Sequence, residues 1–329
     1  MIKSIRFQNF KALRNATLPL GRFTLIVGPN GSGKSTVLKA LELINDPSKL
    51  HFNQVVSADK RESGEITVEI CMSPDNAFLT DDMILRWLTD QAGFQEYVGL
   101  YSAKWISAIK TTRVYSLNAD SIAAPVALRP GIEMLKDGGN LAAVLDQLRD
   151  LHPERFESLN NALQQWLPEF DRILFETPKQ GMRTFALRMR NGKHKIAATD
   201  LSQGTLLALA MLTLAYLPEP PALIGLEEPD RVMHPRLLRD VQDALYRLSY
   251  PENYGEEREP VQVIATTHSP YFLDLFRDHP EEVVIAEKID QGTRFERLSD
   301  QPNIDEILQD SHLGEVWYTG ILGGVPAHP

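Results

Sequence analysis

Residues 28–36 read GPNGSGKST, and their glycine, lysine and serine positions fit the spacing G-x-x-x-x-G-K-[ST]. Glycines in such a loop let successive backbone N–H groups curve around a chain of phosphates without side-chain clashes. Lys34 is then expected to reach the β- and γ-phosphates, and Ser35 to hold Mg²⁺. The pattern predicts a nucleotide-binding loop rather than an ordinary glycine-rich turn. The predicted nucleotide contacts are Asn30, Gly31, Ser32, Gly33, Lys34, Ser35 and Thr36.

Two carboxylates follow a second apolar run, in the stretch ALIGLEEPD at 222–230. Acids at the carboxyl end of a parallel strand lie where ligands bind in such sheets. We expect Glu227 to join the Mg²⁺ shell through water, and Glu228 to act as the general base that polarises the attacking water. The alternative is an acidic, solvated turn after a strand.

Two further segments carry polar residues at the ends of elements. In LSQGT at 201–205, Ser202 is expected to cap a helix whose first N–H groups, near Gly204, form an anion site; taken alone, this pattern is more typical of a plain cap. In VQVIATTHSP at 261–270, His268 ends an apolar strand, and its ring N–H is expected to reach the γ-phosphate.

The elements around these residues indicate an α/β fold. An apolar run at 23–27 precedes the glycine-rich loop and a helical pattern at 37–44 follows it. Alternating residues predict strands at 2–7 and 65–72, and Asn191-Gly192 predicts a hairpin at 183–199. From 205 onward, predicted helices (205–216, 235–248 and 270–276) alternate with predicted strands (222–226, 261–266 and 282–286). This alternation predicts a mainly parallel core sheet.

The composition limits the class of partner. The chain has 329 residues, 34 basic and 44 acidic, giving a formal net charge of −10, which does not favour a broad nucleic-acid-binding face although a local patch remains open. The single cysteine, Cys71, allows no internal disulfide and indicates a reduced, cytoplasmic setting. The longest apolar-rich stretch, 206–217, is too short to span a bilayer and predicts a buried helix.

The set GPNGSGKST, LSQGT, LIGLEEPD and ATTHSP resembles the ABC-type ATPase heads of the SMC, RecF and OLD-like families. The opening IKSIRFQNFKAL and the closing LGEVWYTGILGG also look like the ends of these heads. The resemblance covers about 1–75 and 180–290 plus the tail. It implies a P-loop ATPase with ATP and Mg²⁺ as ligands.

The resemblance also implies site roles. Ser202 and Gly204 would contact the γ-phosphate held by another subunit, Glu228 would be the catalytic base, Lys34 would bind phosphate, and His268 would be the switch histidine. His234 would lie in the turn at the dimer interface. The chain departs from the family pattern at Glu227, where Asp is usual, and at Gln203 and Thr205 in the signature. Gln54 is a candidate for the Q-loop glutamine, although a surface residue is the simpler interpretation.

We therefore expect an ATPase lobe at 1–75, a mainly helical insertion at 76–180, a second ATPase lobe at 181–290 and a tail at 291–329. The predicted function is an ATPase that dimerises, or forms a higher assembly, around ATP and controls a separate effector protein. The effector we expect is a nuclease in phage defence. Alternatives are a RecF- or SMC-like ATPase of DNA repair or maintenance, and a nucleotide-gated scaffold with negligible hydrolysis. A transporter ATPase is disfavoured because no membrane segment is predicted. Only 61 residues follow His268, too few for a Toprim nuclease domain.

Overall fold

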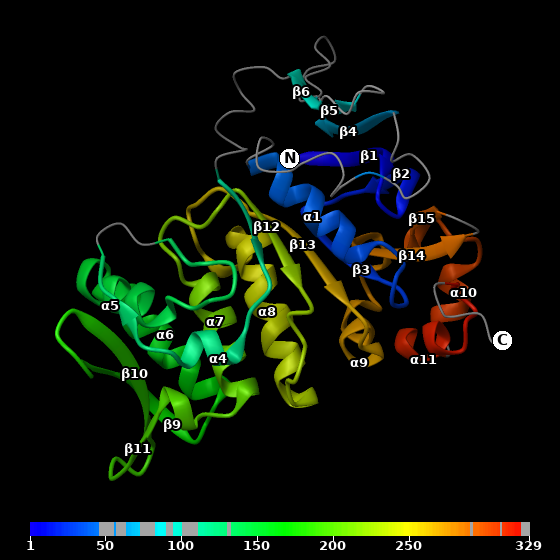
Figure 1. The fold of residues 1–329 in the computed structure, drawn as a ribbon. Helices are drawn as coiled ribbons and strands as arrows, with labels where there is room; N and C mark the ends of the chain where they lie inside the picture. Colours follow the sequence, from blue (N-terminus) through cyan, green and yellow to red (C-terminus); the bar gives the residue numbers. More distant parts are fainter. Residues whose placement is uncertain are drawn as a thin grey trace. The chain divides into compact units, whose positions relative to one another are not determined.

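The chain divides into two compact units in a computed structural model (Figure 1). Unit 1 comprises Met1–Val114, Pro221–Glu227 and Glu259–Pro329, and unit 2 comprises Tyr115–Pro220 and Glu228–Arg258. The structure describes residues 1–45, 56, 64–72, 83–89, 95–100, 111–129, 133–289, 292–309 and 311–323. Each unit is described below by itself.

Unit 1 contains an antiparallel sheet with the strand order β2-β1-β4-β5-β6. Its strands are β1 (Ile2–Phe10), β2 (Leu13–Pro19), β4 (Gly64–Met72), β5 (Met83–Thr89) and β6 (Gln95–Leu100). Burial alternates along β1, where Ile5 and Phe7 are buried while Arg6 and Gln8 are exposed. One face of this sheet therefore packs into the core and the other meets solvent, as antiparallel sheets commonly do.

The core sheet of unit 1 has the order β15-β14-β3-β13-β12-β7. Its strands are β3 (Phe23–Val27), β7 (Thr112–Tyr115), β12 (Leu223–Glu227), β13 (Gln262–Thr267), β14 (Val283–Ile289) and β15 (Gly292–Arg297). Strand β13 runs parallel to β12 and β3, and β14 runs parallel to β3 and antiparallel to β15. Every residue of β3 and β13 is buried, as expected for parallel strands inside a sheet covered on both faces.

Helix α1 (Lys34–Asn45) joins the two sheets of unit 1 through one hydrophobic cluster. Its buried Val37, Leu38 and Leu41 share that cluster with Phe7 of β1 and Ile264 of β13. Because α1 begins at Lys34, this packing fixes the end of the glycine-rich loop. The other helices among the described residues of unit 1 are α9 (Pro270–Leu273), η6 (Asp274–Phe276), η7 (Pro280–Glu282), η8 (Leu298–Asp300), α10 (Ile304–Gln309) and α11 (Leu313–Tyr318).

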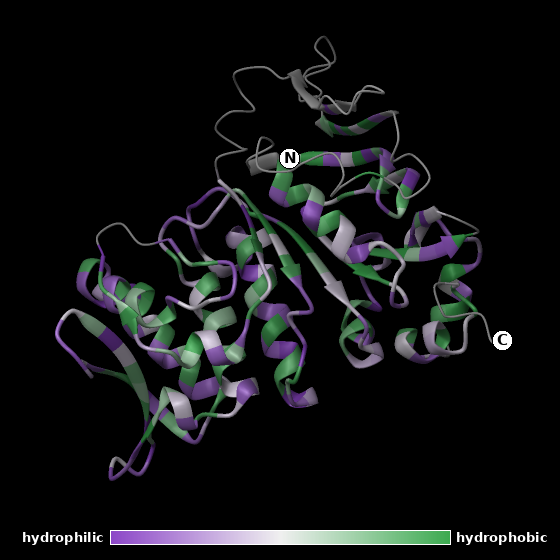
Figure 2. Ribbon diagram, viewed as in Figure 1, coloured by the Kyte–Doolittle hydropathy of each residue, from purple (hydrophilic) through white to green (hydrophobic). Residues whose placement is uncertain are grey.

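Unit 2 is built around the buried helix α7 (Gln203–Ala215), in which every residue from Thr205 to Ala215 is buried. Figure 2 shows hydrophobic residues concentrated in this helix and in the strands of the core sheet. Helix α7 packs against α4, α6 and α8. The helices of unit 2 are α4 (Ala119–Ala123), α5 (Leu141–Leu151), α6 (Pro153–Trp166), η3 (Ala198–Asp200), η4 (Pro235–Leu237), α8 (Leu238–Ser249) and η5 (Pro251–Tyr254).

A small antiparallel sheet completes unit 2 and contains the hairpin predicted from Asn191-Gly192. Its strands are β8 (Val126–Ala127), β9 (Phe170–Glu176), β10 (Met182–Met189) and β11 (Lys195–Ala197). Gly192 adopts φ +67, a conformation that favours glycine. The hairpin prediction is confirmed by the β10–β11 pairing.

The α/β fold with a β-rich N-terminal lobe and a mainly parallel core sheet is confirmed, but two details of the sequence-based organisation differ. The described residues of the segment 76–180, which we expected to be mainly helical, contain helices α4, α5 and α6 but also strands β5, β6, β7, β8 and β9, which the sequence did not predict. Strand β5 pairs with β4 from Gly64↔Thr89 to Ile70↔Met83, so pairing with a distant strand decided the conformation of a short apolar run.

The second difference concerns residues 181–290, which do not form one lobe. Strands β12 and β13 pair side by side with β3 and therefore belong to unit 1, while α7 and the turn after Glu227 belong to unit 2. Within the part of the chain that the structure describes, no helix has the length and apolar character needed to cross a membrane.

Candidate nucleotide-binding site

The loop between β3 and α1 has the backbone that a phosphate-binding loop needs. Gly31 and Gly33 have φ values of +78 and +93, which side-chain-bearing residues rarely adopt. A Cβ atom on Gly28 would lie 2.3 Å from the carbonyl oxygen of Ala286, and one on Gly33 would lie 2.7 Å from Leu13 Cδ2. Conformation or space therefore requires glycine at all three positions.

Lys34 stabilises the loop from within. Its ammonium donates hydrogen bonds to the carbonyl oxygens of Gly28 (2.8 Å) and Pro29 (2.9 Å), and it lies 3.4 Å from Ser32 Oγ. Lys34 is only 5% exposed. Two loop carbonyls hold this buried ammonium inside the curve of the loop. Its positive charge attracts an anion that enters the loop from solvent.

Ser35 and Glu227 come together although 192 positions separate them. Ser35 Oγ donates a hydrogen bond of 2.8 Å to Glu227 Oε1, because α1 begins beside the end of β12. Ser35 is exposed and Glu227 half-buried. A hydroxyl and a carboxylate at this distance supply oxygen ligands of the kind that Mg²⁺ prefers.

The turn after β12 has an unusual backbone. Glu228 adopts φ +46 and Val232 adopts φ +54, although neither is glycine and Val232 is β-branched. Hydrogen bonds close the turn from Arg231 N–H to the Glu228 carbonyl (3.0 Å) and from Met233 N–H to the Asp230 carbonyl (3.3 Å). Left-handed residues of this type cost of order 1–3 kcal/mol each and cluster at functional sites.

His268 lies in a short connection between β13 and α9. Thr267 Oγ1 accepts a hydrogen bond from Ser269 N–H (2.9 Å), and Ser269 Oγ caps α9 by accepting from Phe272 N–H (3.3 Å). Val27 of β3 pairs with Thr267, so the strands before the glycine-rich loop and before His268 end at the same level of the sheet. His268 is half-buried, and the hydrogen bonds made by its neighbours Thr267 and Ser269 hold the backbone on both sides of it.

Ser202 caps α7 in unit 2, as the sequence predicts. Its hydroxyl oxygen accepts a hydrogen bond from Thr205 N–H (3.1 Å) and lies 2.8 Å from Thr205 Oγ1. A Cβ atom on Gly204 would lie 2.9 Å from the carbonyl oxygen of Val232. The start of α7 and the 228–234 turn are therefore in direct contact. His234 is exposed, and its Nδ1 accepts from Arg236 N–H (3.2 Å).

The residues present fit a nucleoside triphosphate with Mg²⁺. Glycine positions that a side chain would fill form the cradle, Lys34 supplies the cation, and Ser35 with Glu227 supplies oxygen ligands. Among the described residues, no group of three or more His, Cys, Asp and Glu residues forms a metal site. The donor set matches Mg²⁺, which keeps several waters and takes few protein ligands.

The sequence did not point to the residues that support the loop from behind. Ala286 of β14 lies against Gly28, and Thr293 of β15 lies 3.0 Å from the position of a Cβ atom on Gly33. Thr293 is 4% exposed, and its hydroxyl makes no hydrogen bond to other described residues. Only the spatial pairing of β14 with β3 brings this hairpin to the loop, so no local pattern could have revealed it. The candidate Gln54 lies outside the described residues.

A salt-bridged group in unit 2 supports the end of α8. Glu256 lies between Arg247 (2.6 Å) and Arg258 (2.6 Å), and the Arg247 guanidinium stacks 4.5 Å from the centre of the Tyr216 ring. Burial alone would raise the pKa of Glu256, but the hydrogen bond from Arg258 and both positive charges outweigh it and hold the pKa below its ordinary value. Burial raises the pKa of Tyr254, as does its hydrogen bond to Asp243 (2.7 Å).

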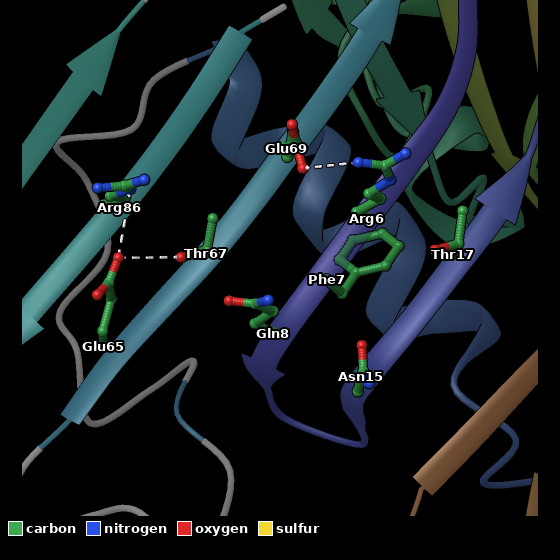
Figure 3. A pocket seen from close by; sticks show the side chains of 9 residues that line it. All are labelled: Arg6, Phe7, Gln8, Asn15, Thr17, Glu65, Thr67, Glu69 and Arg86. Carbon is green, nitrogen blue, oxygen red and sulfur yellow. Dashed lines mark hydrogen bonds and ion pairs between the residues drawn. The ribbon is translucent and has the colours of Figure 1, made fainter.

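A shallow polar hollow of about 420 Å³ lies on the solvent face of the antiparallel sheet (Figure 3). Its charged side chains pair with one another, Arg6 with Glu69 (3.5 Å) and Arg86 with Glu65 (3.2 Å). Residues 28–36 do not line it. Exposed pairs of this kind contribute about 0–1 kcal/mol each, so the hollow is explained as a solvated sheet face.

Comparison with known proteins identifies related families. A family model described as "AAA domain, putative AbiEii toxin, Type IV TA system" matches residues 79–274, and one described as "AAA ATPase domain" matches residues 1–139. An OLD nuclease of Thermus scotoductus is 23% identical over 367 residues, covering 95% of this chain and 68% of that protein. The phosphate import ATP-binding protein PstB of Synechococcus is 44% identical over 45 residues, 13% of this chain and 16% of that protein.

Solved structures of SMC heads share the fold. The SMC head domain of Thermotoga maritima matches with a TM-score of 0.51 and 16% identity, covering 90% of this chain and 98% of that one. The Smc head of Pyrococcus furiosus, bound to the C-terminal domain of ScpA, matches with a TM-score of 0.58 and 15% identity, covering 94% and 99%. At these identities the likeness shows the fold alone.

Proposed function

Because this chain belongs to the AAA-domain family whose model matches residues 79–274, and is an ABC-type ATPase head of the RecF, SMC and OLD-like superfamily, we propose that it binds and hydrolyses ATP and dimerises around it. The observation that carries the proposal is the group formed by Lys34, Ser35 and Glu227 at the mouth of a glycine-constrained loop.

Binding is assigned to the loop and the start of α1. Backbone N–H groups from Asn30 to Thr36 would donate to phosphate oxygens, supported by the positive end of α1. The carbonyls of Gly28 and Pro29 hold the Lys34 ammonium inside the loop, near the position in which it would bind phosphate. When ATP binds, phosphate oxygens would replace these carbonyls as its hydrogen-bond acceptors. Ser35 and Glu227 would hold Mg²⁺, which when bound neutralises developing charge on the phosphates.

Hydrolysis is assigned to Glu228 and His268. Glu228 would accept a proton from the attacking water, and the left-handed backbone at this residue sets the direction of its side chain. His268 would donate a hydrogen bond from its ring to the terminal phosphate. Its fixed neighbours, Thr267 and Ser269, keep the ring from drifting away from the strand end.

Dimerisation is assigned to the start of α7 and the adjoining turn. Ser202 Oγ accepts from Thr205 N–H, and when Thr205 Oγ1 is the donor of the bond between the two hydroxyls, the Ser202 hydroxyl would donate to a phosphate oxygen of ATP bound to a second copy. His234 and Val232 lie on the adjoining turn, and Val232 is 54% exposed. Each ATP would then bridge two copies, so that binding closes the dimer and hydrolysis opens it.

The closing dimer would act on a separate effector protein. The similarity to an OLD nuclease supports a nuclease as that effector, and a role in phage defence is part of the same proposal. A RecF- or SMC-like role in DNA maintenance predicts that DNA stimulates ATP hydrolysis, although the formal net charge of −10 does not favour this. A nucleotide-gated scaffold would bind ATP without releasing phosphate.

Phosphate release from ATP and Mg²⁺ by the purified protein tests the enzymatic part. We expect steady release by the wild type and a loss of at least about 100-fold in Lys34→Ala, which lacks the ammonium. Binding measured by thermal shift separates the alternatives. Stabilisation by ATP without release would leave the scaffold, and stimulation by duplex DNA would favour DNA maintenance. A protein that neither binds ATP nor releases phosphate from it would refute the proposal.

A further inference from the structure

The tail sequence LGEVWYTGILG forms a packed segment in unit 1 that contacts α9, the helix following His268. In this C-terminal segment, Leu313–Gly323, the side chains of Leu313, Val316 and Trp317 are buried, and α11 packs against α9 and η6. The segment is therefore an ordered part of the unit that contains the candidate site.

Gly314 and Pro270 approach each other closely. A Cβ atom on Gly314 would lie 2.2 Å from the carbonyl oxygen of Pro270 and 2.9 Å from its Cβ. The φ angle of Gly314 is not left-handed, so glycine is needed here for space and not for backbone conformation. The first turn of α11 thus lies directly on the backbone of α9.

Two hydrogen bonds hold the tail in this position. Asp274 Oδ1 accepts from Gly314 N–H (2.7 Å), and the Arg277 guanidinium donates to the carbonyl oxygen of Leu308 in α10. Asp274 and Arg277 both belong to the chain immediately after α9. The C-terminal segment is therefore held to Pro270 and Asp274, while α10 is held to Arg277 at the other end of the segment 270–277.

His268 is two residues from the point of contact. Ser269 connects them through the hydrogen bonds that fix β13 to α9, so a displacement of Pro270 is transmitted to the histidine. Interiors are packed too closely to absorb such a displacement locally.

We propose that Gly314 and Asp274 are positioning residues, and that the C-terminal segment holds α9 so that His268 keeps the orientation needed for hydrolysis. This inference rests on the proposed ATPase function. Gly314→Ala would push α9 away from α11, and Asp274→Ala would release the first turn of α11 without adding atoms. The nucleotide contacts of residues 28–36 are left intact by both changes.

The first test compares kcat and KM for ATP hydrolysis by the full chain. Because a shift of about 1 Å in a catalytic group can cost about 100-fold, we expect Gly314→Ala to lower kcat by at least about tenfold while KM changes less than about twofold. Asp274→Ala should lower kcat by about fivefold, and Asp274→Asn, which keeps the acceptor oxygen, should restore most of it. The matched control is Gly292→Ala, since the nearest atom to its new Cβ is 3.9 Å away.

The second test measures hydrogen exchange at the amides of Phe272 and Leu273 without nucleotide. Exchange should be faster in Gly314→Ala and Asp274→Ala and unchanged in Gly292→Ala and Asp274→Asn. If the wild type does not hydrolyse ATP, the proposed function fails, and with it the catalytic part of this inference; the exchange comparison then still decides whether the C-terminal segment holds α9.

Three results for Gly314→Ala and Asp274→Ala would overturn the inference. These are unchanged exchange in both variants, an unchanged kcat, or a rise in KM that matches the fall in kcat. If Gly314→Ala does not fold, Asp274→Ala is judged by the same criteria, with Asp274→Asn as its control.

Discussion

Replacement of Gly33 by alanine tests the packing that supports the nucleotide-binding loop. Gly33 has φ +93, and its new Cβ would lie 2.7 Å from Leu13 Cδ2 and 3.0 Å from Thr293 Oγ1. Gly31 is a matched control, because it has φ +78 but no atom within 4 Å of the position of its Cβ. Both substitutions strain the backbone, and only the substitution at Gly33 adds a clash.

The expected losses follow from these two contributions. A left-handed alanine costs roughly 1–2 kcal/mol, so Gly31→Ala should lower the free energy of unfolding by about that amount. Overpacking adds about 1–3 kcal/mol, so Gly33→Ala should lower it by about 2–5 kcal/mol. The difference between the variants isolates the contact with Leu13 and Thr293.

Urea unfolding without nucleotide measures this difference. Tryptophan fluorescence and far-ultraviolet circular dichroism should be recorded together, because their coincidence checks that one transition is being compared. A Thr293→Ala change in the Gly33→Ala background should recover part of the loss by making room for the new methyl group. Equal losses in Gly31→Ala and Gly33→Ala would refute the reasoning that the β14–β15 hairpin packs under the loop.

Three other predictions follow from the structure. Glu228→Gln should slow phosphate release by at least about 100-fold while ATP still raises the melting temperature, because only the proton acceptor is lost. Phosphate release at the wild-type rate would show that Glu228 is not the general base. Gly204→Ala should lower the free energy of unfolding by about 1–2 kcal/mol in urea, since its Cβ would lie 2.9 Å from the Val232 carbonyl oxygen, and wild-type stability would contradict that contact. The pKa of Glu256 is held below its ordinary value of 4.5, mainly by Arg258 against the opposing effect of burial, so the stability it contributes is complete above that value and is lost as the pH falls through the folded-state pKa. Glu256→Gln should therefore be less stable than wild type at pH 7 and approach it in acid, and a pH-independent difference in urea would contradict this.

The sequence predicted the elements whose signals are local. The strand at 23–27, the glycine-rich loop and helix α1 lie together in the chain, and their patterns were sufficient. Helix α7 was equally clear, because an apolar run capped by Ser202 forms a buried helix. The same local character explains why the hairpin at Asn191-Gly192 could be predicted.

Elements that depend on distant pairing could not be predicted in the same way. Strand β5 takes its conformation from its pairing with β4. The supporting contacts of the candidate site have the same origin. Thr293 meets Gly33 and Gly314 meets Pro270 only because the sheet and the tail bring them together, and no spacing in the sequence marks them.

The central claim, that ATP closes two copies of this head, is tested most directly by light scattering of Glu228→Gln. One chain has a mass of 37.0 kDa. With ATP and Mg²⁺ the account predicts a species of twice that mass or a larger assembly, and the mass of one chain with ADP or after the further change Lys34→Ala. A Glu228→Gln protein that binds ATP and keeps the mass of a single chain would contradict the account.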